Sequence, residues 1–226
     1  MPSLNQFAYV NNTSDYKFGH NSIPNIPITG SPDDANLFRV AMLYDGSAYR
    51  FYAFQRGSSN VLYQYSFNGS SYTYGYNSIP KLTLEGFPSD VDASSFSMLH
   101  DGSSYRLYMR KLGDPTTLYQ AAFVPGTTTY KYGYNSIPQI KCTGFPSDTD
   151  WSRWAMLHDG STYRIYAFKL GSNTQFYQGA YDGNSYAYGH NSIPVLNLVG
   201  TPANSDLHDM SMLFDGQNYR LYLQTL

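Results

Sequence analysis

A seven-residue motif recurs four times along the chain, and its spacing limits what the chain can fold into. The four copies read FGHNSIP, YGYNSIP, YGYNSIP and YGHNSIP, at residues 18–24, 74–80, 132–138 and 188–194. Consecutive copies are 56, 58 and 56 residues apart. A second motif, MLxDGxxYRxY, keeps the same spacing at residues 42–52, 98–108, 156–166 and 212–222. The chain therefore consists of four repeats of about 57 residues, a period typical of solenoids, propellers and similar arrays.

Each repeat carries two signals for a β-hairpin. The first is an Asp-Gly pair between two strand-like runs, at Asp45, Asp101, Asp159 and Asp215. Asp-Gly favours the positive φ angles of a type I′ turn, whose twist matches the flanking strands. The second turn is Asn68-Gly69 or Asp182-Gly183 in two repeats and is longer in the other two. No segment has the 3.6-residue apolar period of a helix, so we expect an all-β fold.

The two strands of the first hairpin differ in pattern. The strand after the Asp-Gly turn alternates, so we expect the odd-numbered residues of YRFYAF (49–54) on one face and the even-numbered residues on the other. The strand before the turn carries a repeated methionine beside a small residue, and we place this strand innermost. Close packing around a narrow central channel explains these methionines, which are Met42, Met98, Met156 and Met212.

Four units of two hairpins each predict a four-bladed β-propeller of sixteen strands, a single domain over residues 1–226 with NSIP anchors at 21, 77, 135 and 191. The chain begins with the second hairpin of a repeat (Gln6 to Gly19) and ends with the first (Met212 to Leu226). We expect these two hairpins to complete one blade and so to close the ring, which protects both sheet edges.

This architecture resembles the hemopexin-like four-bladed propellers in blade number and approximate size. Domains of that family usually carry a disulfide between the first and last blades and a short helix in each blade. Neither feature can be identified in this sequence, whose only cysteine is Cys142. The resemblance therefore implies a fold and no functional residue.

Composition excludes several classes of function. Charged residues are 13% of the chain and the net charge is −2, which argues against a nucleic-acid partner and against disorder. No apolar run is long enough to span a bilayer, and the start, MPSLNQFAYV, shows no signal peptide. The compartment stays unknown, and we expect a monomer or small oligomer. The chain is rich in tyrosine, with 24 Tyr and 13 Phe, and tyrosine suits both β-structure and flat contact surfaces.

The NSIP motif has two interpretations. In the structural one, Gly ends a strand, Asn forms an Asx-turn and Pro restricts the backbone, so the motif is a corner between blades. In the functional one, an aromatic ring beside an amide binds a sugar, because the ring stacks on C–H groups and the amide bonds hydroxyls. The candidate ligand-binding residues are His20, Asn21, Tyr76, Asn77, Tyr134, Asn135, His190 and Asn191.

Four arginines at one strand position, each flanked by tyrosines, also allow two interpretations. They either pair with a repeated Asp, stack on Tyr and connect the blades, or they form four Arg–Tyr pockets that bind anionic or hydroxylated ligands. These further candidates are Arg50, Arg106, Arg164 and Arg220. A repeated [DN]-x-[DN] pattern could hold calcium, although turn formation explains it as well, and its carboxylates include Asp90, Asp92, Asp148 and Asp150. Neither a metal site nor another cofactor is otherwise indicated.

Two functions of different classes fit these features. The first is a non-enzymatic, lectin-like propeller that binds glycans or a glycoprotein at several near-equivalent sites. The second is a protein-interaction scaffold without a small ligand, because propellers present loop-rich faces and Tyr and Arg are favoured at interfaces. An enzyme ranks lowest and no catalytic residue is assigned, because a catalytic site needs several different groups in one place, whereas here every polar group is repeated.

Overall fold

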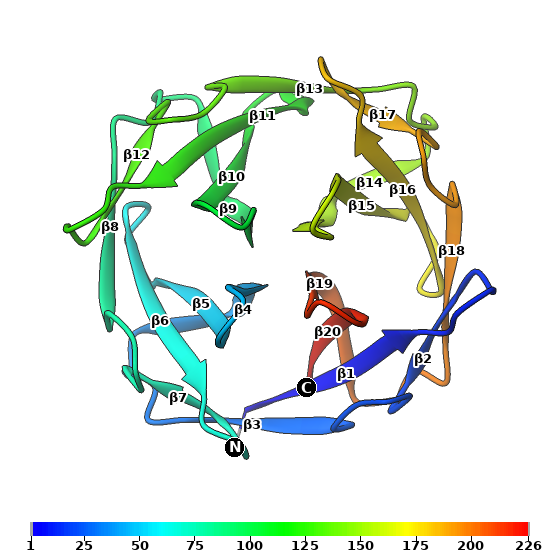
Figure 1. Cartoon of the computed structure of the whole chain (residues 1–226), viewed down its shortest axis with the longest axis horizontal. Coiled ribbons are helices and arrows are strands. Elements are labelled where there is room, and N and C mark those ends of the chain that lie inside the picture. Colours follow the sequence, from blue (N-terminus) through cyan, green and yellow to red (C-terminus); the bar gives the residue numbers. More distant parts are fainter. Residues whose placement is uncertain (1, 226) are drawn as a thin grey trace.

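This computed structural model describes residues 2–225, which form twenty strands and no helix. The strands form one continuous sheet that closes into a ring around a central axis (Figure 1). Four units of five strands follow one another around the ring. The all-β prediction is therefore confirmed, whereas the predicted total of sixteen strands is wrong. The additional strand of each unit lies in the segment that follows the NSIP motif.

Two long strands of each unit form an antiparallel hairpin near the axis. The innermost strands are β4 (Ala35–Tyr44), β9 (Val91–His100), β14 (Thr149–His158) and β19 (Ser205–Phe214). Their partners are β5 (Tyr49–Gln55), β10 (Tyr105–Lys111), β15 (Tyr163–Lys169) and β20 (Tyr219–Thr225). In the turn between β4 and β5, Gly46 has a positive φ of 89° and Asp45 does not. The predicted type I′ geometry is therefore wrong, because it needs two consecutive residues with positive φ.

Three further strands of each unit lie at the periphery. The longest of them are β6 (Val61–Phe67), β11 (Asp114–Phe123), β16 (Gln175–Tyr181) and β1 (Ser3–Tyr9). A short strand before each NSIP motif pairs with them, namely β7 (Tyr72–Tyr74), β12 (Thr129–Tyr132), β17 (Tyr186–Tyr188) and β2 (Asp15–Phe18). The strands after the motif are β8 (Lys81–Glu85), β13 (Gln139–Thr143), β18 (Val195–Val199) and β3 (Asn25–Thr29).

The strand after each NSIP motif connects one unit to the next through backbone hydrogen bonds. β8 pairs antiparallel with β6 of its own unit and parallel with β12 of the following unit. β13, β18 and β3 pair in the same two ways. The twelve peripheral strands therefore form a closed hydrogen-bonded ring. Each NSIP motif is the loop between two strands that pair with the same neighbour, which confirms that the motif is a corner.

The two ends of the chain meet in one unit, as predicted. β1 pairs antiparallel with β20, with Leu4 opposite Gln224 and Ala8 opposite Arg220. β2 completes the outer edge and β19 the inner edge of this unit. β1 and β20 lie side by side in Figure 1. The ring is thus closed by main-chain hydrogen bonds between segments more than 200 residues apart in sequence.

The hydrophobic core is divided into four clusters, each of which involves two neighbouring units. Phe51 and Ala53 pack in one cluster, and Tyr52 and Phe54 pack in the next, which confirms the predicted alternation along β5. The four repeated methionines are fully buried. Three of them, Met42, Met98 and Met212, line a space of only about 10 Å³, so side chains almost fill the centre of the ring.

We predict that Phe7→Ala lowers the free energy of unfolding by about 3–5 kcal/mol, because it deletes a large aromatic side chain from a packed core. Phe7 lies on the closing strand β1, is 0% exposed and packs edge-to-face on Phe18 at 5.6 Å. Urea unfolding followed by fluorescence measures the change. Lys17→Ala, on the exposed face of the same hairpin, is the matched control and should change stability by less than about 0.5 kcal/mol. Equal effects of the two substitutions would show that closure by β1 does not hold the ring together.

Candidate functional site

Four equivalent pockets lie between neighbouring units, and we call them the inter-unit pockets. Their volumes are about 350, 300, 350 and 370 Å³. One unit supplies an Arg, a Gln and the Asn-Ser-Ile of the motif, and the next unit supplies aromatic residues. Between the β4–β8 unit and the β9–β13 unit, the lining residues include Arg50, Tyr52, Gln64, Asn77, Ser78, Ile79, Tyr105, Phe123 and Tyr130. A pocket of this size suits a ligand as small as a single sugar ring.

The arginine is the one charged residue among the described side chains that line each pocket. Arg50 lies near the start of β5, and its Nε contacts Asp45 Oδ2 at 2.5 Å. Its Nη1 donates to the Asn77 carbonyl at 3.1 Å and to Ser66 Oγ at 3.0 Å. Nη2 has no hydrogen-bond partner of good geometry within residues 2–225. The guanidinium is thus fixed in place through Nε and Nη1.

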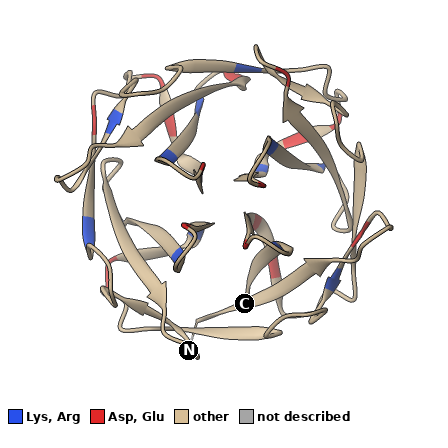
Figure 2. Cartoon of the chain, viewed as in Figure 1, with Lys and Arg blue, Asp and Glu red and all other residues tan. Residues whose placement is uncertain are grey.

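A tyrosine from the next unit completes a cluster around each Asp. Tyr105, on β10, donates from its hydroxyl to Asp45 Oδ2 at 3.0 Å. Equivalent bonds join Tyr163 to Asp101 and Tyr219 to Asp159. Tyr49 donates in the same way to Asp215, which lies in the unit that both chain ends form. Figure 2 shows a blue and a red segment side by side in each central hairpin. We call this arrangement the Asp–Arg–Tyr cluster, and it connects every pair of neighbouring units.

The pKa values of the four aspartates reflect this environment. Burial alone would raise the pKa of Asp45, but hydrogen bonds from Arg50, Ser47 and the backbone outweigh it and hold the pKa well below its usual range. The same balance lowers the pKa of Asp159 to about 2. Burial also raises the pKa of Tyr105, as does the charge of Asp45. The carboxylates are therefore ionised and the tyrosines are neutral donors at physiological pH.

The NSIP loop forms the outer lip of each pocket, and unusual backbone angles shape it. Gly75 and Asn77 both have positive φ, at 68° and 43°. Asn tolerates this left-handed conformation better than most residues with a Cβ, which explains its recurrence. With its amide oriented to satisfy both ends, Gln64 donates to the Ile79 carbonyl at 3.1 Å and accepts from Arg50 Nη1 at 3.1 Å. The loop is thus attached to the Arg that lines the pocket.

The structure brings together two of the three predicted kinds of ligand-binding residue. The four arginines and the motif asparagines, Asn21, Asn77, Asn135 and Asn191, all line the inter-unit pockets. The motif rings, His20, Tyr76, Tyr134 and His190, do not line them. Tyr76 is 42% exposed and lies outside the pocket on the same loop. Within residues 2–225, the side chains of the motif asparagines do not make the predicted Asx-turn bond. Two of them, Asn21 and Asn191, contact the neighbouring His instead.

The aromatic walls of the pockets were predicted only in part, as the tyrosines that flank each repeated Arg. The tyrosine before each repeated Arg lines the pocket of the preceding unit, and the tyrosine two residues after the Arg forms the floor; examples are Tyr105 and Tyr52. Two further rings complete each wall. One is Phe67, Phe123, Tyr9 or Tyr181, and the other is Tyr72, Tyr130, Tyr16 or Tyr186. Their recurrence was visible in the sequence, but the pairing of one unit's Arg with the next unit's Tyr depends on how the units pack.

The aspartates considered for calcium have protein partners. Asp90 accepts from Tyr119 at 2.7 Å and lies 3.4 Å from Lys111, and Asp92 is paired with Arg110 at 2.8 Å. Asp148 and Asp150 also have protein partners, which include Tyr177 for Asp148 and Arg153 for Asp150. No group of three or more His, Cys, Asp or Glu within residues 2–225 has the geometry of a metal site. Calcium binding at these positions stays a prediction.

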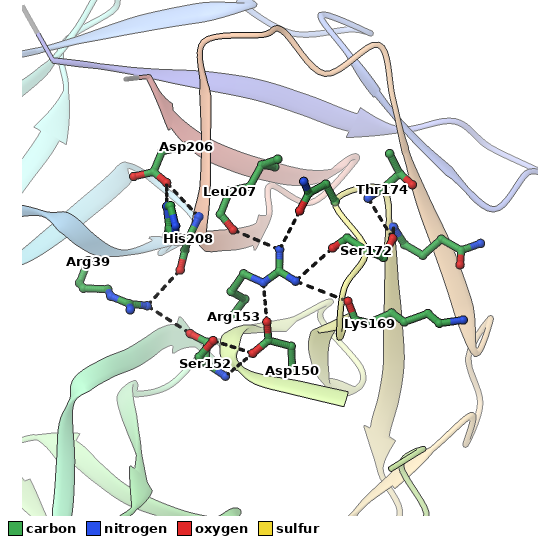
Figure 3. Close-up of polar contacts among 12 residues, drawn as sticks. Arg39, Asp150, Ser152, Arg153, Lys169, Ser172, Thr174, Asp206, Leu207 and His208 are labelled. Carbon is green, nitrogen blue, oxygen red and sulfur yellow. Dashed lines mark hydrogen bonds and ion pairs between the residues drawn. The ribbon is translucent and has the colours of Figure 1, made fainter. Parts of the chain in front are cut away.

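An unrepeated polar network lies at the end of the inner strands away from the Asp-Gly turns (Figure 3). Arg153 pairs with Asp150 at 2.7 Å, donates to backbone carbonyls that include Leu207 and Ser172, and lies over the ring of Phe168. Arg39 reaches from the opposite unit and donates to the carbonyls of Ser152 and His208, at 3.1 Å each. These bonds connect three units, so we interpret the network as structural.

Asp209 is the buried acid of this region. Its Oδ2 accepts from the backbone N–H of Val40 in the neighbouring unit at 2.9 Å. Burial raises the pKa of Asp209 to about 7, although the Val40 hydrogen bond and the charge of Arg39 act in the opposite direction. The side chain therefore takes up a proton on folding at mildly acidic pH.

We predict that Asp101→Asn lowers the free energy of unfolding by about 2 kcal/mol, because it leaves Arg106 without its carboxylate partner at a largely buried position. The matched control is Asp182→Asn, in another Asp-Gly turn, where the carboxylate bonds the backbone of Asn184 and Ser185 and has no Arg partner. Chemical denaturation of both variants measures the difference. An equal effect at the two positions would mean that the turn, and not the Asp–Arg–Tyr cluster, accounts for the loss.

A second prediction concerns pH. The pKa of Asp209 is higher in the folded chain, at about 7, than its ordinary value of 3.8, so the folded state binds the extra proton between these values. The contribution of Asp209 to the free energy of unfolding should therefore be greatest near pH 4 and should fall as the pH rises to 7. Asp209→Asn keeps an oxygen acceptor for Val40 and should remove this fall. Thermal unfolding at pH 4 to 8 tests it, and an unchanged slope in the variant would contradict the assignment.

Comparison with known proteins identifies no family. No family model matches the chain, and no curated protein matches it. The solved structures that resemble it include AofleA from Arthrobotrys oligospora and a variant of AofleA in which three arginines are replaced by alanine. Each is 16% identical over 81% of this chain, with TM-scores of 0.36 and 0.34. The alignments cover 49% of those chains, so the chain spans about half the length of AofleA.

Proposed function

We propose that the ring is a four-bladed β-propeller that binds carbohydrate without catalysing a reaction, with one site in each inter-unit pocket. The observation that carries this proposal is the fourfold repetition of a pocket with aromatic walls, apolar side chains and one immobilised arginine. A sugar ring has an apolar C–H face that packs on aromatic rings and hydroxyls that accept from Arg Nη2.

Equivalence of the four sites supports binding over catalysis. Each pocket repeats the same kinds of side chain, and no pocket lining holds an acid or a histidine among the described residues. General acid–base chemistry on a glycoside needs at least two carboxyl groups in most enzyme families. Four weak sites on one rigid ring can instead bind a multivalent glycan with much higher avidity than a single site provides.

A second candidate, the protein-interaction scaffold, is favoured by exposed apolar residues outside the pockets. Phe38, Leu112 and Leu170 are 64%, 54% and 62% exposed. All three lie near the ends of inner hairpins opposite the Asp-Gly turns, where Ala35 pairs with Gln55. Aromatic and aliphatic side chains of this kind form the centres of protein interfaces.

A glycan array with the unaltered protein is the first test, and we expect binding to a defined set of sugars. A variant with Gln at Ile23, Ile79, Ile137 and Ile193 should lose most of this binding and stay folded. These side chains line the pockets and are 37–50% exposed, so their replacement changes a pocket wall without opening the core. The matched control replaces Leu112 and Leu170 by Gln, outside the pockets, and should bind normally.

Other outcomes separate the two candidates. A blank array, with and without calcium, would exclude carbohydrate binding. Loss of binding in the control variant and retention in the pocket variant would place the interaction on the opposite face. Recovery of a defined protein partner that free sugars do not displace, combined with a blank array, would favour the scaffold.

A further inference from the structure

We infer that the inter-unit pockets select neutral sugars and disfavour acidic ones, an inference that rests on the carbohydrate-binding function proposed above. A pocket whose one charged residue is an arginine would ordinarily be assigned to an acidic ligand, because Arg is the usual partner of carboxylates and phosphates. The surroundings of these four arginines argue for the opposite selectivity.

The first reason is that each arginine is already neutralised. Arg50 pairs with Asp45 and Arg164 with Asp159, at 2.5 and 2.6 Å from Nε. The side chains of the four aspartates are only 2–4% exposed, so a ligand cannot displace them. Asp45 also accepts hydrogen bonds from the Ser47 and Ala48 N–H groups, from Ser47 Oγ and from Tyr105. A ligand that enters the pocket therefore meets an ion pair with no net charge.

The second reason is the number of free N–H groups. A carboxylate or phosphate gains most from Arg through two parallel bonds from neighbouring nitrogens. In all four pockets Nε donates to Asp and Nη1 donates to the motif Asn carbonyl. The Gln side chain is also within bonding distance of Nη1. Nη2 is the remaining nitrogen, so two parallel bonds cannot form and an acid would accept from one nitrogen alone.

The third reason is the cost of removing an acid from water. The other lining residues are neutral, and in the pocket of Arg106 they are Tyr, Gln, Asn, Ser and Ile. Moving a carboxylate into such surroundings without an available counter-charge is unfavourable, whereas a hydroxyl loses far less hydration. A neutral sugar can accept one bond from Nη2 and place its apolar face on Tyr163 or Ile137, which line the same pocket. The balance therefore favours the neutral ligand.

Pairs of sugars that differ only at C6 test this inference on the unaltered protein. The probes are the methyl glycosides of glucose and galactose and those of glucuronic and galacturonic acid, measured by calorimetry or NMR titration at pH 7. In at least one pair, we expect the neutral member to bind and the acid to bind at least about tenfold more weakly. We also expect the affinity of the neutral member to be the same in 50 and 500 mM salt, because no net charge contributes.

Replacement of the four aspartates Asp45, Asp101, Asp159 and Asp215 by Asn provides a second test. It should release the arginine charge and raise the affinity for the acid relative to the neutral sugar. The matched control is Asp182→Asn, in another Asp-Gly turn outside the four pockets, where the carboxylate bonds the backbone of Asn184 and Ser185, so the ratio of affinities should not change. If the fourfold variant does not fold, the measurement on the unaltered protein still decides.

The outcomes distinguish this inference from the proposed function. An acid that binds as tightly as its neutral partner, or more tightly, would overturn the selectivity and leave carbohydrate binding in place. A blank glycan array together with no binding in any pair would overturn both.

Discussion

Every boundary between units carries the same hydrogen bond, which a tyrosine of one unit donates to an aspartate of the preceding unit. Asp45 is buried and already bonded to Arg50, and Tyr105 is the contact that carries this cluster across the boundary between units. Because the chain repeats the cluster four times, every boundary between units has the same contact. This includes the boundary between the first unit and the unit that both ends of the chain form.

The same cluster creates the pocket. An arginine fixed by an aspartate at Nε and by a loop carbonyl at Nη1 cannot move to fill the space between two units. The NSIP loop, whose Gly and Asn have left-handed backbone angles, borders the same pocket, which Ile193 and Tyr219 also line. Stability and the candidate binding site therefore share residues, and a substitution in the Asp–Arg–Tyr cluster affects both.

Much of this fold could be predicted from the repeats. The period predicted four units, the incomplete terminal repeats predicted the pairing of β1 with β20, and the alternation of YRFYAF predicted which side chains face each neighbour. The twelve-strand peripheral ring could not be predicted. The segments after NSIP, such as KLTLE, are short and pair in parallel with a strand of the next unit, a contact for which a local pattern gives no evidence.

The candidate site was predicted in part for a related reason. Arg50 and Asn77 recur and are polar, so composition and spacing identified them, whereas Tyr105 appeared to belong with its own neighbour Arg106. In the folded ring Tyr105 belongs to the pocket of Arg50, because a strand turns alternate side chains towards different units. The aromatic ring of the motif misled for the opposite reason: Tyr76 is adjacent to Asn77 in sequence, but in the folded ring Asn77 lines the pocket and Tyr76 does not. In a ring of repeats, the residues that form one site come from two consecutive copies, and the sequence of a single repeat therefore contains two halves of two different sites.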